Sequence, residues 1–265
     1  MSRAHGDPDL RNSDLHHPDL PLASSLVDTA EIARFNALAA QWWNPNGPMK
    51  PLHRLNPVRL GFLKTEFAGH FARDARAMRP FEGLTLLDIG CGAGLVAEPM
   101  ARQGFAVTGI DLAAENIAVA QAHAQAEGLT IDYRASPIET LPETEKFDAI
   151  TLLEVVEHVP DVEAFVHEAA LRLKPGGMLI ASTLNRTMKA YALAIIGAEY
   201  VLRWLPVGTH DWDKFVTPDE LDADFESAGL VPATRSGMVF NPLGNDWRLS
   251  TDCDVNYLAS ATKPA

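Results

Sequence analysis

The sequence predicts an α/β fold built on a mostly parallel, doubly wound sheet. Three observations support this prediction. From residue 85 to residue 184, short apolar runs typical of buried strands alternate with stretches of helical period. The first apolar run leads directly into a glycine-rich turn, and the second ends in an acidic residue. Parallel strands also need right-handed crossovers, which the intervening helices supply.

Helices are predicted ahead of this alternating region. Residues 25–40 place Ile32, Phe35 and Leu38 on one helical face. Four prolines then interrupt regular structure, and a further helix is predicted to follow Asn56, with Pro57 in its first turn. Residues 1–25 are polar and dotted with prolines, so we expect a disordered N-terminal tail.

Seven strands are predicted in total. Five should be parallel: TLLDIGC, AVTGIDL, TIDYRAS, FDAITLLEV and MLIASTL. The helices between them include VEAFVHEAALRLKPGG, which is expected to close at Gly176 and Gly177. After Thr183 the alternation stops, and residues 186–216 form a long helical insertion. Two late strands, VPATRSGMVF and DVNYLASATK, are expected to add an antiparallel edge. We therefore expect one domain over residues 26–265.

The composition argues against several classes of protein. The 265 residues carry a formal net charge of −13 and contain no basic run, so no nucleic-acid partner is expected. Cys91 and Cys253 form no CxxC pair, which argues against a disulfide or zinc framework and favours a cytoplasmic location. The sequence shows no secretory signal and no apolar run long enough to span a bilayer.

The glycine turn predicts a cofactor site. Gly90, Gly92 and Gly94 follow Asp88, and glycines permit a sharp turn and the close approach of a ligand. Asp111 ends the next strand, where a carboxylate can accept hydrogen bonds from a ribose diol. The spacing is GxGxG and not the GxGxxG that seats a pyrophosphate, so a cationic sulfonium ligand fits better. A nicotinamide or flavin enzyme and a turn without a ligand are the alternatives.

Three ionisable residues follow the fourth predicted strand: Glu154, Glu157 and His158. On a helical turn, residues with this spacing can face one point. They could hold a divalent cation, for which oxygen ligands favour magnesium, while the histidine also suits zinc or manganese. Alternatively, His158 is a general base near neutral pH. A third reading is structural, because acids at the start of a helix are stabilised by its dipole.

Several stretches that occur together in order resemble one enzyme family. They are WWNPNGPMKPLHRLNPVR, LLDIGCGAG, EVVEHVPD, STLNRT, GTHDWDKF and DVNYL. Over residues 28–260 the chain resembles the ubiquinone-biosynthesis O-methyltransferase family, which belongs to the Rossmann-like class I S-adenosylmethionine-dependent methyltransferases. The resemblance implies methyl transfer from S-adenosylmethionine to ring hydroxyls of polyprenylated catechol or demethylubiquinol intermediates, at both O-methylation steps of ubiquinone biosynthesis.

The resemblance also implies roles for individual residues. The implied cofactor contacts are Arg59, Gly90, Asp111 and Leu153, with Gly92 and Asp88 as weaker candidates. Arg59 can offer a bidentate fork to the methionine carboxylate, or it forms only a surface salt bridge. At Glu154, Glu157 and His158 the chain resembles divalent-cation-dependent enzymes, which implies Mg²⁺ or another divalent cation at this trio. In either case Glu154 and His158 are the candidates that activate the phenol.

An apolar stretch within the insertion, residues 188–207, is too short to span a bilayer. Such a segment can lie in the membrane interface or cover the active site as a lid, and both readings remain open. The first would place the protein peripherally on the cytoplasmic face of the inner membrane, beside other ubiquinone-biosynthesis proteins. Two other functions remain as alternatives: a non-catalytic S-adenosylmethionine-binding subunit of a membrane-associated complex, and a small-molecule methyltransferase of another substrate class.

Overall fold

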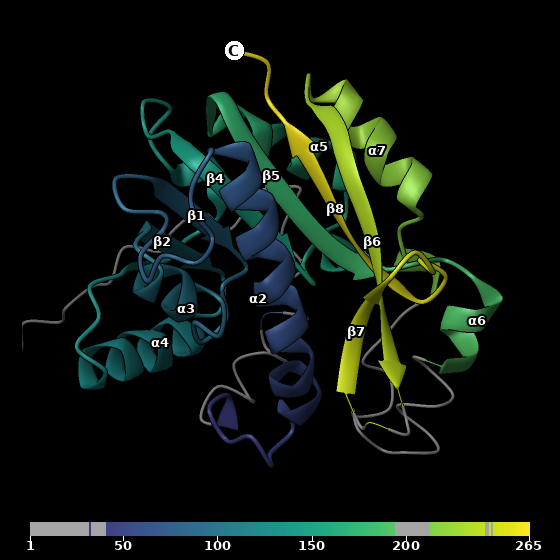
Figure 1. The fold of residues 1–265 in the computed structure, drawn as a ribbon, viewed down its shortest axis with the longest axis horizontal. Helices are drawn as coiled ribbons and strands as arrows, with labels where there is room; N and C mark the ends of the chain where they lie inside the picture. The colour runs from purple at the N-terminus through teal and green to yellow at the C-terminus, as the bar shows by residue number, and fades with distance from the viewer. Residues whose placement is uncertain (1–31, 33–40, 194–211, 242–243, 245) are drawn as a thin grey trace, which may run out of the picture.

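The computed structural model describes residues 32, 41–193, 212–241, 244 and 246–265. Eight strands form one sheet: β1 Thr85–Ile89, β2 Ala106–Asp111, β3 Asp132–Ala135, β4 Phe147–Leu153, β5 Leu173–Leu184, β6 Val231–Asn241, β7 Asp246–Ser250 and β8 Asn256–Thr262. Their order is β3-β2-β1-β4-β5-β8-β6-β7, and β1 to β5 are parallel (Figure 1). The predicted parallel sheet with an antiparallel edge is confirmed, with one strand more than the seven expected.

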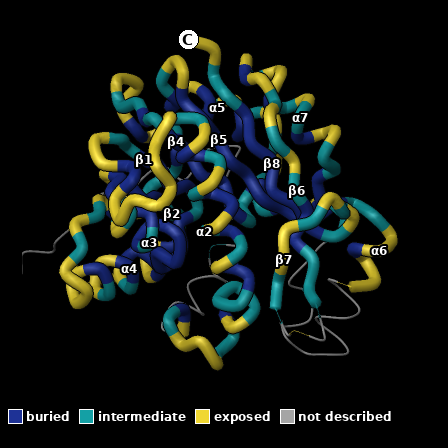
Figure 2. Tube along the Cα trace, in the orientation of Figure 1, coloured by how far each residue is buried: buried dark blue, intermediate teal, exposed yellow. Residues whose placement is uncertain are grey.

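The helices cover both faces of the sheet. They are α2 Lys50–His70, α3 Ala97–Arg102, α4 Ala114–Ala126, α5 Val162–Leu171, α6 Met188–Ala190 and α7 Pro218–Ser227. Side chains of α2, α3 and α4 share one apolar cluster with Leu86 of β1, whereas those of α5 and α7 share another with the adjacent Leu87. Because successive strand residues point to opposite faces, the central strands β1 and β4 between the two helix layers are largely apolar and buried. Figure 2 shows the resulting band of burial along the central strands.

The helix before β5 is shorter than predicted. It ends at Leu171, and the segment that includes Gly176 and Gly177 belongs to β5. Backbone hydrogen bonds explain the difference: Gly176 N–H donates to the Lys263 carbonyl at 3.0 Å, and Lys263 N–H donates to the Gly177 carbonyl at 2.9 Å. A partner strand therefore recruits residues whose local sequence favours a helix end.

The helix α2 begins earlier than predicted. It starts at Lys50, and Pro57 lies inside it and not in its first turn. Pro51 occupies the first turn, where its missing N–H costs no helical hydrogen bond. Packing then outweighs the defect at Pro57, because Phe62, Leu63 and Phe67 are all nearly inaccessible to solvent.

Two predicted segments lie outside the described residues. The tail of residues 1–25 is one, and the helix of residues 25–40 is described only at Ile32. Of the predicted insertion, residues 186–193 and 212–216 are described. Within the described part of the chain, no helix is both long and apolar enough to cross a membrane.

Candidate functional site

The turn after β1 has the backbone that its glycines predict. Gly90, Gly92 and Gly94 have φ angles of 70°, 54° and 91°, in the left-handed region that side chains disfavour. A Cβ atom on Gly90 would lie 2.8 Å from Val155 Cγ2, and one on Gly92 would lie 2.6 Å from the Trp42 ring. The glycines are therefore needed both for the backbone conformation and for close packing on either side of the turn.

Asp111 ends β2 beside this turn. Its carboxylate accepts hydrogen bonds from Gly92 N–H and Ala113 N–H, each at 2.8 Å, and from the Asn116 side chain. Burial raises the pKa of Asp111, while these hydrogen bonds oppose the rise. The carboxylate is thus fixed at the carboxyl end of the parallel strands, where open α/β sheets bind their ligands.

Arg59 and Asp88 are two buried side chains of opposite charge that attract each other. Arg59 is only 3% exposed, and burial lowers its pKa, against the attraction of Glu154 and Asp88. Asp88 Oδ1 accepts a 2.7 Å hydrogen bond from Thr151, and burial raises the pKa of Asp88 to about 6. Two atoms of the pair, Arg59 Nε and Asp88 Oδ2, are buried and have no hydrogen-bond partner. Buried polar atoms without partners are costly, so they mark a place where a polar ligand would be stabilised.

Glu154 follows β4 in an unusual backbone conformation. Its φ angle of 54° is left-handed, although it is not a glycine. Two interactions hold its side chain: Ser182 Oγ donates to Glu154 Oε1 at 2.8 Å, and Arg59 Nη1 lies 4.0 Å from the same oxygen. Strained backbone of this kind collects at functional sites, which supports Glu154 as a candidate.

Glu157 lies deeper than Glu154, on the short 3₁₀ turn Val156–His158. It is 5% exposed, and its Oε2 accepts a 2.8 Å hydrogen bond from Thr183 Oγ1. Burial and the nearby charge of Glu154 raise the pKa of Glu157 to about 7, against the effect of His158. His158 is half-buried at the end of the same turn. A buried carboxyl with a pKa near neutrality is typical of active sites.

The predicted metal site is not formed by the side chains as they are placed. The helical turn begins only at Val156, so Glu154 is not on it and does not share a helical face with Glu157 and His158. Ser182 and Thr183 each engage one of the two carboxylates. Across the ranges that the structure describes, no group of three or more His, Cys, Asp or Glu side chains is arranged to hold a metal ion.

The sequence-predicted residues gather at one edge of the sheet. Leu153 is the last residue of β4 and is 8% exposed, next to Glu154. Sequence reasoning missed the residues that hold the predicted ones in place: Trp42, Asn56, Asn116, Thr151, Ser182 and Thr183. The sequence did contain a signal for Ser182 and Thr183. They lie near the carboxyl end of β5, the strand beside β4, so they reach the same edge of the sheet. No comparable signal links Asn56 and Asn116 to the site.

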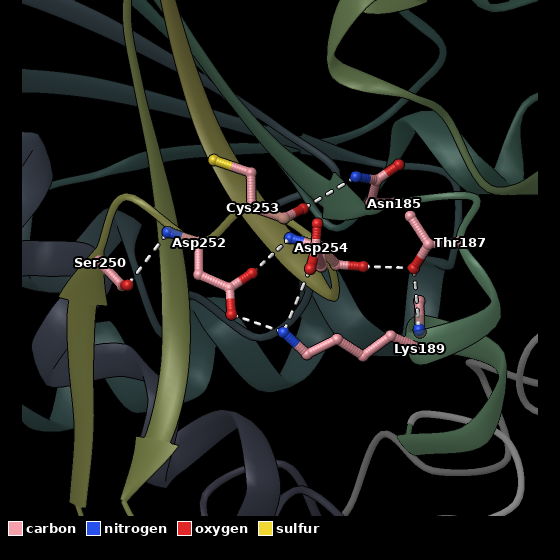
Figure 3. Close-up of polar contacts among 8 residues, drawn as sticks. Asn185, Thr187, Lys189, Ser250, Asp252, Cys253 and Asp254 are labelled. Atoms are coloured by element: carbon pink, nitrogen blue, oxygen red, sulfur yellow. Dashed lines mark hydrogen bonds and ion pairs between the residues drawn. The ribbon is translucent and has the colours of Figure 1, made fainter.

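The described start of the insertion is tied to the loop between β7 and β8. Lys189 Nζ lies 2.5 Å from Asp252 Oδ2 and 3.3 Å from Asp254 Oδ2, and Asn185 Nδ2 donates to the Cys253 carbonyl at 2.9 Å (Figure 3). These bonds join α6 and the residue that follows β5 to the loop before β8. They hold the described residues 186–193 beside the end of β5.

Comparison with known proteins yields close and consistent relatives. Residues 87–181 match the family described as a methyltransferase domain. Two curated relatives carry the name ubiquinone biosynthesis O-methyltransferase. That of Paramagnetospirillum magneticum is 57% identical over 88% of this chain and 94% of the relative, and that of Chelativorans sp. is 56% identical over 90% and 94%.

The fold is also found among solved structures. The magnesium protoporphyrin IX methyltransferase from Synechocystis with bound SAH aligns with a TM-score of 0.62, over 89% of this chain and 98% of that one, at 18% identity. The same enzyme with bound SAM aligns with a TM-score of 0.59 at 20% identity. At such low identity these similarities establish the Rossmann-like methyltransferase fold and nothing finer.

Proposed function

Since this chain belongs to the ubiquinone-biosynthesis O-methyltransferase family, we propose that it transfers methyl groups from S-adenosylmethionine to ring hydroxyls of polyprenylated catechol and demethylubiquinol intermediates. We propose the same activity for both O-methylation steps of ubiquinone biosynthesis. The observation that carries the proposal is identity above 50% along nearly the whole chain, together with a buried acidic site at the glycine turn.

The residues at the glycine turn suit S-adenosylmethionine. Its methionine part carries one carboxylate and one ammonium group, and the site offers one unpaired Arg59 Nε and one unpaired Asp88 Oδ2. Arg59 would therefore hold the carboxylate, and Asp88 the ammonium. Asp111 would accept the ribose hydroxyls, and the left-handed backbone at Gly90 and Gly92 would turn the chain sharply beside the ligand. The Leu153 carbonyl would face the same space at the end of β4.

S-adenosylmethionine supplies an electrophilic methyl group on a positively charged sulfur. The protein must supply a nucleophile, and a phenol with a pKa of about 10 is mostly protonated at neutral pH. We propose that His158 takes the phenol proton as general base. Ser182 and Arg59 both interact with Glu154 Oε1 and hold its side chain. The other carboxylate oxygen of Glu154 would accept a hydrogen bond from a hydroxyl of the phenol substrate and so orient its ring. The water-poor surroundings of Glu157 would keep the new phenolate reactive.

The role of a divalent cation stays a proposal, and we derive no step through it. The closeness of two carboxylates supports it, because the charge of Glu154 helps to raise the pKa of Glu157. A cation between them would relieve this repulsion, but both side chains would first have to leave their hydroxyl partners. If Mg²⁺ binds there, it should raise the melting temperature of the wild-type protein and not of Glu157→Gln. An equal effect of Mg²⁺ on both proteins would reject the site.

Membrane association is the remaining part of the proposal. The polyprenyl tail of the substrate is expected to stay in the bilayer, so the protein would work peripherally on the cytoplasmic face of the inner membrane, near other ubiquinone-biosynthesis proteins. Support comes from Met188 and Leu193, which are 74% and 54% exposed where the insertion begins. Most of residues 188–207 lies outside the described residues. Co-sedimentation with liposomes, with and without this segment, distinguishes docking from a lid.

The central experiment is a methyl-transfer assay with labelled S-adenosylmethionine and a short-tailed catechol. The wild-type protein should label the ring oxygen, and Asp111→Asn should lower activity mainly through weaker cofactor binding. The control Asp219→Asn alters an exposed carboxylate on α7 and should leave activity unchanged. Cofactor binding without any methyl transfer would instead indicate a non-catalytic binding subunit, and absence of both would refute the proposal.

A further inference from the structure

Two adjacent tryptophans lie against the glycine turn and have no part in the chemistry proposed above. We call residues 41–49 the tryptophan strap. Trp42 is 8% exposed, and its Nε1–H donates to Asn116 Oδ1 at 2.9 Å. Trp43 is half-buried, and its Nε1–H donates to the Ala93 carbonyl at 3.1 Å. Both indole rings are therefore hydrogen-bonded to residues of the candidate cofactor site that are distant in the sequence.

The ring of Trp42 touches the turn itself. A Cβ atom on Gly92 would lie only 2.6 Å from Trp42 Cη2, so the six-membered edge of the indole rests on the Gly92 backbone. Met49, Ala93 and Leu95 complete a small apolar cluster around the ring. Trp42 thus forms part of the enclosure of the turn that seats the cofactor.

Asn116 connects this ring to the ribose-binding carboxylate. It lies in the first turn of α4 and is 1% exposed. Its amide group donates to Asp111, and its carbonyl oxygen accepts from Trp42. One buried amide therefore bridges Trp42 and Asp111, so a change in the position of one side chain alters the hydrogen bonds of the other. Gly92 N–H donates to the same carboxylate, and the Trp42 ring packs on Gly92, so the three residues form one connected network.

The tryptophan strap is also held by interactions that involve three helices, α2, α3 and α4. Trp43 stacks on His123 with ring centroids 3.6 Å apart and an interplanar angle of 2°. His123 Nδ1 lies 2.7 Å from Glu98 Oε1, which comes from α3. The Trp42 carbonyl is within 2.7 Å of His53 Nε2 on α2. Three helices therefore hold the strap in place at once.

We infer that Trp42 is a cofactor-positioning residue, whose ring encloses the nucleoside end of the cofactor while Asn116 couples it to Asp111. This inference rests on the proposed function, because it needs an adenosylated ligand at the glycine turn. It predicts that the strap slows release of the cofactor. Trp42 and Asn116 are both buried, and a hydrogen bond is stronger where water is excluded.

S-adenosylhomocysteine is the probe, since it binds without turnover. Its affinity and dissociation rate are measured by calorimetry and stopped-flow fluorescence for the wild type, Trp42→Ala, Trp42→Phe and Trp247→Phe. Trp247 is the matched control, because it lies on β7, at the opposite end of the sheet from β2 and β3. We expect Trp42→Ala to weaken binding about tenfold or more, through faster dissociation.

Trp42→Phe keeps an aromatic ring but loses the N–H donor and the outer part of the indole that packs on Gly92. Dissociation should be at least about two- to tenfold faster, because one hydrogen bond alone is worth that range. The change in tryptophan fluorescence on adding S-adenosylhomocysteine should be smaller in this variant, in which Trp43 still lies beside the site, and persist in full in Trp247→Phe. These readouts separate cofactor positioning from a general loss of structure, and they decide the matter even if Trp42→Ala fails to fold.

Three results would overturn the inference. A folded Trp42→Ala that binds as tightly as, or more tightly than, the wild type would reject it and leave the proposed function intact, as would a fluorescence change retained in full by Trp42→Phe. If the wild type itself binds no S-adenosylhomocysteine, the proposed function fails and the inference fails with it.

Discussion

The substitution Asp88→Asn should stabilise the protein at neutral pH while impairing its cofactor site. Burial raises the pKa of Asp88 from its ordinary value of 3.8 to about 6, in spite of the Thr151 hydrogen bond and the nearby Arg59. The folded chain therefore holds the proton more tightly than the unfolded chain. Ionisation of Asp88 lowers the free energy of unfolding as pH rises from about 4 to about 6, and the loss persists above that range.

The size of the effect follows from that difference in pKa. A tenfold change in proton affinity corresponds to about 1.4 kcal/mol, so the ionised carboxyl group costs about 3 kcal/mol at pH 7.5. An asparagine removes this cost, but it brings amide hydrogens to a carboxyl position beside the Ala97 backbone N–H, which is itself a donor. A buried unpaired donor costs about 1–3 kcal/mol, which leaves a net gain of up to about 2 kcal/mol.

Urea denaturation at pH 7.5 and pH 5 measures this gain. The gain should be clear at pH 7.5 and smaller at pH 5, where part of the wild-type Asp88 is protonated. The matched control is Asp148→Asn. Partial burial raises the pKa of Asp148, but hydrogen bonds from Lys174 and Thr85 outweigh this and lower it, so its ionisation stabilises the fold and its replacement should destabilise it at pH 7.5. A variant Asp88→Asn that is less stable at pH 7.5, or whose gain does not depend on pH, would refute the reasoning.

Three further predictions concern stability, each measured by urea denaturation. Tyr257→Phe removes the hydroxyl that donates to the Val216 carbonyl at 3.0 Å, so the free energy of unfolding should fall by about 1–2 kcal/mol; an unchanged value would mean that another donor reaches this carbonyl. Gly94→Ala should cost about 2 kcal/mol or more, because φ is 91° and the new methyl group would overlap the Tyr133 hydroxyl. Adding Tyr133→Phe should recover part of that loss, and no recovery would assign the cost to the backbone alone. Thr217→Ala breaks the capping box of α7 and should cost about 1 kcal/mol; a loss below a few tenths would show that water caps this helix equally well.

The parallel part of the sheet was predictable because each strand carries its own signal. Strands β1, β2, β4 and the second half of β5 are largely buried on both faces, so they appear as mostly apolar runs between helices. The strand β7 was missed for the opposite reason. It has only five residues, all at least partly exposed, and among the strands that the structure describes it pairs with β6 alone. Its existence depends on a partner strand and not on its own composition.

The candidate site could be predicted where the type of a single residue already indicates its conformation or its charge. The glycine turn and Asp111 did so, since φ and charge are local properties. The partners of Arg59 and Glu154 did not, because Asn56 and Ser182 are ordinary residues whose role comes from the strands and helices that meet at this edge. The trio at 154, 157 and 158 shows the limit most clearly. A helical spacing predicted a common face, and the left-handed backbone at Glu154 prevents it.

The position of β8 has a consequence for folding. This strand follows β6 and β7 in the sequence, yet it lies between β5 and β6. The β6–β7 hairpin therefore reaches the rest of the sheet only through β8, which pairs with β5 on one side and with β6 on the other. Tyr257, Leu258 and Ala259, all fully buried, occupy this position. A truncation that removes residues 256–262 should thus separate β6 and β7 from the parallel strands and expose the margin of β5.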